Sequence, residues 1–267
     1  MSTLYHYTTP AGFQGILQSK GIWATDTRFL NDRDEFKTGW DVFRDVLAAN
    51  EARLKQDHQE VYNQISAIIR GIHIMTSHVA SFTLNGDMLS QWRGYNGGYG
   101  FSLGFSSDAL NSAAQSQSFE MAPVVYERAD HLKAMQGVFD TLFDILKDGK
   151  RPQRQSVLIW WIRVLGAVSI FKNTHFKEEA EYRIFAGVAA DTDSIKVRST
   201  ARSLIPYLQM QLDAMVPHMA PHSNLGLTEV VVGPAMAANQ IPAAEFLLTQ
   251  YGIDVPVRAS SIPYIGA

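Results

Sequence analysis

Residues 176–185, FKEEAEYRIF, contain three glutamates within the four positions 178–181, at the start of a strand-like pattern. If a strand begins near Glu179, alternation directs Glu179, Glu181 and Arg183 to one side of a sheet. The two carboxylates are then about 7 Å apart on one face. In a cleft they would stabilise a developing positive charge, such as the oxocarbenium-like transition state of glycosidic chemistry. On a solvated sheet edge, Arg183 would simply neutralise its neighbours.

A histidine lies in the first strand-like segment, residues 4–7. Alternation places His6 and Thr8 on one face of that strand and Tyr5 and Tyr7 on the other. The first face carries two hydrogen-bonding groups suited to a ribose or an amide. A lone histidine is nevertheless more often a surface residue or a satisfied core residue.

Aromatic residues surround the glycine-rich turn at residues 96–98. Trp92, Tyr95 and Tyr99 flank this turn, and Ser102 follows on a segment that alternates large and small residues. A planar heterocycle would find a stacking surface here, and the glycines would let backbone groups approach it. The other interpretation is that these aromatics close a hydrophobic core.

The order of these segments resembles that of the ADP-ribosyltransferase superfamily. Its sites take a histidine or arginine from the first strand, a tyrosine or serine from a middle strand, and a glutamate, often as E-x-E, from a late strand. The chain is also similar to a bacterial family of unknown function over nearly its whole length. The shared motifs are a Tyr-His-Tyr-Thr start, a Leu-Asn-Asp loop, a Ser-Phe-Thr strand at 81–83, Trp-x-x-Tyr from Trp92 and Phe-x-x-Glu-x-Glu-Tyr-Arg from Phe176.

The resemblance implies that NAD is the substrate and assigns its binding residues. His6 would hydrogen-bond the 2′-hydroxyl of the adenosine ribose, and Thr8 or a nearby backbone group would help to anchor the cofactor. Tyr95 or Tyr99 would stack on nicotinamide, and Ser102 competes with them for the middle-strand position.

The resemblance also assigns the two glutamates. Glu181 would stabilise the ribosyl oxocarbenium ion, and Glu179 would orient an acceptor, which is a protein, a nucleic acid or a small molecule. The implied function is an NAD-dependent ADP-ribosyltransferase, used as a bacterial conflict effector, toxin or phage-defence protein. The alternatives are a nucleotide-binding sensor without catalysis and a hydrolase of nucleotide or glycosidic bonds.

The elements that must position these residues indicate an α+β fold. Strand-like and helix-like segments do not alternate regularly, and no G-x-G-x-x-G or Walker-type loop follows a strand. The pattern favours a mixed or antiparallel sheet. The resemblance implies that this sheet is split, like that of ADP-ribosyltransferases. We expect one domain over residues 1–267, with helical insertions at about 35–72 and 128–171. Asn31 and Asp32 are expected to order the loop ahead of the first insertion and to cap its helix.

Composition excludes several classes of function. The net charge of −3 gives no footprint for duplex nucleic acid, and the absence of cysteine excludes thiolate chemistry and fits a cytoplasmic protein. The most apolar segment, residues 157–171, contains Arg163 and is shorter than the roughly 20 residues of a membrane span. No metal site is expected, because Pro217 and Pro221 interrupt the helix that would aim His218 and His222 at one ion.

Overall fold

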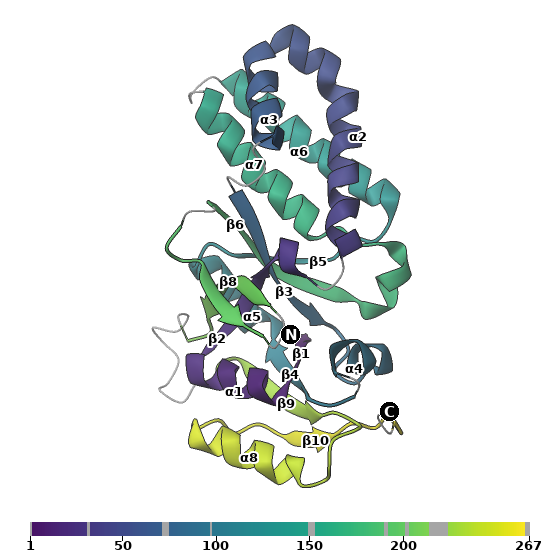
Figure 1. Ribbon diagram of the computed structural model, residues 1–267, viewed down its shortest axis with the longest axis vertical. Helices are drawn as coiled ribbons and strands as arrows, with labels where there is room; N and C mark the ends of the chain where they lie inside the picture. Colours follow the sequence, from purple (N-terminus) through teal and green to yellow (C-terminus); the bar gives the residue numbers. More distant parts are fainter. Residues whose placement is uncertain are drawn as a thin grey trace.

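The computed structural model describes residues 2–30, 33–70, 75–96, 98–148, 153–189, 192–200, 203–213 and 224–264. Across these residues ten strands form one sheet, with the main order β10-β9-β4-β1-β3-β2-β8-β7 and with β6 and β5 attached beside β3 (Figure 1). The strands are β1 (Thr3–Thr8), β2 (Gly21–Asp26), β3 (Met75–Thr83), β4 (Phe101–Ser106), β5 (Glu120–Pro123), β6 (Glu181–Ala189), β7 (Lys196–Ser199), β8 (Leu204–Gln211), β9 (Leu227–Val232) and β10 (Val257–Ala259).

The sheet splits along one edge of β3. Tyr5 of β1 lies opposite Thr83, and Thr25 of β2 lies opposite Val79, so β1 and β2 pair with different parts of the same edge. The other edge of β3 pairs with β6 along its whole length. Every strand pair is antiparallel except β10 with β9. The predicted α+β class, with a mixed and largely antiparallel sheet, is confirmed.

The described residues form two large hydrophobic cores and a small third cluster of Tyr7, Trp92 and Val231. One contains the alternating apolar residues of the central strands, and α1 (Pro10–Ser19), α5 (Ser107–Ser116) and α8 (Gln240–Gln250) cover it. The other lies within a separate helical layer, seen at the top of Figure 1. Its helices are α2 (Arg33–Asp57), α3 (Gln59–Arg70), α6 (Arg128–Asp148) and α7 (Gln153–Ser169). Helical insertions were expected at about 35–72 and 128–171, and these helices lie over the described parts of those ranges. Regularly spaced aromatics such as Trp40 and Phe43 form part of the buried stripe.

The ends of the helices follow local chemistry. Thr9 caps α1, since its Oγ1 accepts a hydrogen bond of 2.9 Å from the backbone N–H of Gly12, and Pro10 follows in the first turn. Two helices were not predicted, α4 (Leu89–Asn96) and α5. The first is only two turns long, and the second buries mainly Leu110 and alanines, so its apolar pattern is weak. No helix of the described chain is long and apolar enough to cross a membrane.

Candidate functional site

Glu181 is the first residue of β6, and only 5% of its side chain is exposed. Arg183 donates from Nε to Oε1 at 2.7 Å and from Nη2 to Oε2 at 3.2 Å. Lys172 donates from Nζ to Oε2 at 2.9 Å. Burial raises the pKa of the Glu181 carboxyl, but the charges of Arg183 and Lys172 outweigh it and lower the pKa to about 2. Glu181 is therefore a buried carboxylate that stays ionised at neutral pH.

Glu179 joins the same cluster from a different element. Its Oε2 accepts a hydrogen bond of 2.5 Å from Lys172 Nζ, so one ammonium group bridges both carboxylates. The expectation that Glu179 begins the strand is wrong, because it ends the 3-10 helix η2 (Thr174–Glu179) and Ala180 has a φ of 43°. That left-handed residue turns the chain, and the strand begins one residue later. The interpretation of a solvated sheet edge is also wrong, since Glu181 and Arg183 are both buried.

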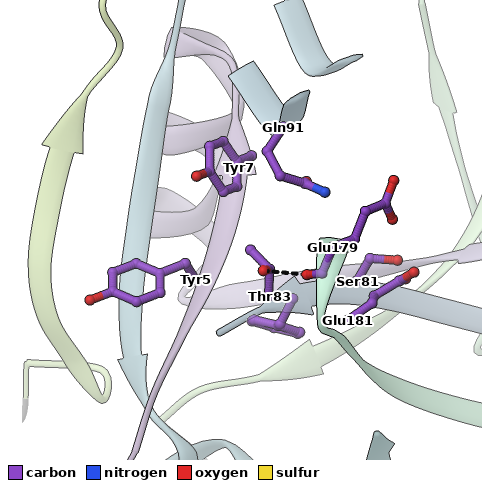
Figure 2. A pocket seen from close by; sticks show the side chains of 8 residues that line it. Tyr5, Tyr7, Ser81, Thr83, Gln91, Glu179 and Glu181 are labelled. Carbon is purple, nitrogen blue, oxygen red and sulfur yellow. Dashed lines mark hydrogen bonds between the residues drawn. The ribbon is translucent and has the colours of Figure 1, made fainter. Parts of the chain in front are cut away.

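Ser81 connects Glu181 to His6. The Ser81 carbonyl lies 2.9 Å from Nδ1 of His6, and because a carbonyl only accepts, Nδ1 carries the hydrogen. The Ser81 hydroxyl lies beside the Glu181 carboxylate and helps to lower its pKa (Figure 2). Burial lowers the pKa of His6, so its ring is neutral at pH 7 and its Nε2 is free to act as an acceptor. His6 and Glu181 thus meet through Ser81 and not by direct contact.

The positions of these three residues follow from strand register. β1, β3 and β6 are neighbours in the sheet, and Glu181 lies opposite Thr83, two residues from Ser81. Side chains two residues apart point to one face, so Ser81 and Glu181 share a face with Tyr5 and Tyr7. The Cβ of His6 starts from the other face, and its ring reaches Ser81 where β1 and β2 separate.

A small cavity opens beside Glu181 (Figure 2). Its volume of about 10 Å³ is room for roughly one water molecule. Hydroxyl, amide and carboxylate groups form most of its wall. The lining residues are Tyr5, Tyr7, Ser81, Phe82, Thr83, Gln91, Glu179 and Glu181. Ligand pockets usually have about 300–1,000 Å³, so this cavity does not accommodate a nucleotide as it stands.

Helix α4 supplies the wall opposite the carboxylates. Gln91 is 7% exposed, and Figure 2 shows its amide on the side of the cavity that faces Glu179. The Tyr7 hydroxyl donates to the Asn85 carbonyl at 3.0 Å and accepts from the Met88 N–H at 2.9 Å, which fixes the segment leading into α4.

His6 reaches the Ser81 carbonyl but does not line this cavity. Three further predicted binding residues lie away from it. Tyr99 is exposed, Ser102 is completely buried opposite Tyr7 on β4, and Thr8 ends β1 against the start of α1. The side chain of Tyr95 lies outside the described residues. The serine whose hydroxyl lies beside Glu181 is therefore Ser81 and not Ser102.

Sequence reasoning missed Ser81, Lys172 and Gln91 as members of the site. The hydroxyls of Ser81 and Thr83 alternate along a strand, which was a usable signal for one polar face. Nothing in the local sequence marks Lys172 or Gln91. Asn31, Asp32, His218 and His222 all lie outside the described residues, and the remainder of the described chain contains no group of three or more side chains placed to hold a metal ion.

The fold and this cluster define an α+β protein that holds an ionised carboxylate beside the split of its sheet. Within it, residues 91–184 match the model of the family described as a protein of unknown function (DUF2971). The match runs from Gln91 of α4 to the strand that carries Glu181 and Arg183, and it confirms a relation to a family of unknown function over these residues. The motifs at the start of the chain, in the Leu-Asn-Asp loop and at 81–83 lie outside the match. No curated protein and no solved structure matches the chain.

Proposed function

We propose that the protein is an NAD-dependent ADP-ribosyltransferase with Glu181 at the ribosyl centre. The observation that carries the proposal is the contact series from His6 through Ser81 to Glu181. These residues come from the first strand, a middle strand and a late strand, which is the order of histidine, serine and glutamate that the sequence resemblance implies. The ionised state of Glu181 supports the same role, because a carboxylate stabilises a positive ribosyl carbon far better than the neutral carboxylic acid does.

The reaction breaks the bond between C1′ of the nicotinamide ribose and the pyridinium nitrogen. The bonding electron pair leaves with nicotinamide, and C1′ becomes an oxocarbenium ion that Glu181 stabilises. An acceptor then attacks C1′ and loses a proton. Nε2 of His6 accepts a hydrogen bond from a ribose hydroxyl, since Nδ1 donates to Ser81.

Glu179 is proposed to orient the acceptor. Its side chain is 22% exposed, whereas that of Glu181 is 5% exposed, so an incoming group reaches Glu179 more readily. Lys172 holds the two carboxylates together and offsets their mutual repulsion.

The test is release of nicotinamide from NAD, with and without a cell extract as the source of acceptor. Glu181→Gln is expected to lower release by about 10²-fold or more per folded molecule under both conditions. Glu179→Gln is expected to suppress transfer and to spare much of the hydrolysis, because water needs less orientation than a large acceptor. Glu60→Gln, on the exposed face of α3, is the matched control. A Glu181→Gln protein as active as the parent would contradict the proposal.

One observation favours a second candidate, a nucleotide-binding sensor without catalysis. Arg183 and Lys172 already occupy both oxygens of Glu181, which reduces the negative charge available to a ribosyl cation. A sensor would bind NAD and release no nicotinamide at any enzyme concentration. Release that no acceptor accelerates would instead indicate a hydrolase.

A further inference from the structure

Arg198 of β7 has an unusual environment for a half-buried arginine. Its Nη2 donates to Thr25 Oγ1 at 3.1 Å, and its guanidinium lies over the Trp23 ring, 5.4 Å from the centroid. Its Nε is buried without a hydrogen-bond partner. Over the part of the chain that the structure describes, Arg198 forms no ion pair.

Other arginines in the described chain have carboxylate partners, whether they are buried, as Arg183 is, or exposed, as Arg28 and Arg258 are. Arg183 pairs with Glu181, Arg28 with Asp26, and Arg258 with Glu229. Burying part of a charged group without a partner costs free energy. Burial also lowers the pKa of Arg198, and no nearby carboxylate opposes that effect. The fold thus keeps an uncompensated cation where an anion would complete its contacts.

The position of Arg198 relates this cation to the candidate site. Thr25, which Arg198 contacts, lies opposite Val79, and Ser81 is two residues further along β3. The side chains of Thr25, Val79 and Ser81 therefore share one face of the sheet, the face that carries Glu181. Arg198 is also close enough to His6 to lower the pKa of that ring. Arg198 and Glu181 lie on opposite sides of the split between β1 and β2.

The span between the two sides limits the ligand. Thr25 and Glu181 are separated by two strand spacings of about 4.8 Å and four residues of about 3.3 Å, which places them about 16 Å apart. A nucleoside monophosphate is shorter than this span, whereas an extended dinucleotide reaches across it.

We propose that Arg198 binds a phosphate group of a dinucleotide whose ribosyl end lies at Glu181. A guanidinium presents paired N–H donors that match phosphate oxygens, and the Trp23 ring beneath it restricts its orientation. Lys196 lies on the same face of β7, two residues before Arg198, and adds a second positive charge. The inference deepens the proposed function and rests on it for the identity of the ligand.

The experiment is calorimetric titration of the full chain with ADP and with adenosine, which lacks phosphate. The parent is expected to bind ADP more tightly than adenosine. Arg198→Gln is expected to weaken ADP binding at least tenfold and to leave adenosine binding unchanged. Arg198→Lys keeps the positive charge but lacks the paired N–H donors. Its affinity for ADP should lie between those of the parent and Arg198→Gln. Arg44→Gln, which removes an exposed arginine of α2, should match the parent.

Unfolding curves without ligand establish that each variant is folded. Equal ADP affinity in the parent and Arg198→Gln would overturn the proposal, as would absence of ADP binding by the parent at millimolar concentration. Neither measurement depends on turnover. A protein that releases nicotinamide but binds ADP independently of Arg198 refutes this inference alone. Arg198-dependent ADP binding without nicotinamide release refutes the transferase and retains the phosphate subsite.

Discussion

Glu181 and Arg198 lie on one face of the same sheet, but within the described chain only the charge of Glu181 is paired with opposite charges. Two cations contact the Glu181 carboxylate within 3 Å, whereas Arg198 contacts a hydroxyl and an indole ring. The first charge is deeply buried and folding requires its compensation. The second is half-buried and is left for a ligand to compensate. The comparison separates a charge that contributes to stability from a charge that is available for binding.

The largest expected effect on stability comes from Glu181→Gln. The substitution leaves Arg183 and Lys172 buried with less negative charge between them, and breaking a buried ion pair commonly costs about 3–5 kcal/mol. Urea unfolding at pH 7 measures the change, with Glu60→Gln as the control. A Glu181→Gln protein as stable as the parent would show that the cluster does not hold its charges as described.

A smaller effect is the acid dependence that Glu181 introduces. Its pKa is lowered from 4.5 to about 2, so its contribution to stability is complete above about pH 4.5 and is lost as pH falls toward 2. The loss corresponds to about 3 kcal/mol. His78, whose pKa burial lowers to about 4, destabilises the fold as pH falls below 6.5, but it does so in parent and variant alike. Subtracting the free energy of unfolding of Glu181→Gln from that of the parent at each pH therefore isolates the contribution of Glu181. A difference that does not change between about pH 4.5 and 2 would contradict the lowered pKa of Glu181.

The smallest expected effect is that of Arg198→Gln on the ligand-free protein. The variant loses one hydrogen bond to Thr25, worth about 1 kcal/mol, and is relieved of an uncompensated charge, so the two changes nearly cancel. Thermal unfolding without ligand should change little. A destabilisation as large as that of Glu181→Gln would mean that Arg198 has a structural role, and the comparison between the two charges would fail.

Spacing along one segment predicted part of the site. Glu181 and Arg183 are two residues apart on a strand, and alternation alone places them on one face. The long helices followed in the same way from local patterns. Each of these features depends on residues that are neighbours in sequence.

The remainder of the site depends on contacts that are distant in sequence. Ser81 meets Glu181 only through the register of β3 with β6, about a hundred residues later. Gln91 reaches the cavity because α4 packs beside β1, and α4 itself has a weak apolar pattern. Ala180 adopts a left-handed conformation that is uncommon for any residue except glycine, so the turn that separates Glu179 from the strand was not predictable.

Thermal unfolding of the parent with and without NAD tests the central claim most directly. A ligand that binds only the native state, at a concentration of ten times its Kd, raises the free energy of unfolding by about 1.4 kcal/mol. For a chain of this size, that corresponds to a rise in Tm of about 3 °C. NAD is expected to raise the Tm by this amount or more, and His6→Ala is expected to fold normally and to reduce the shift. No shift of the parent Tm at millimolar NAD would contradict the account.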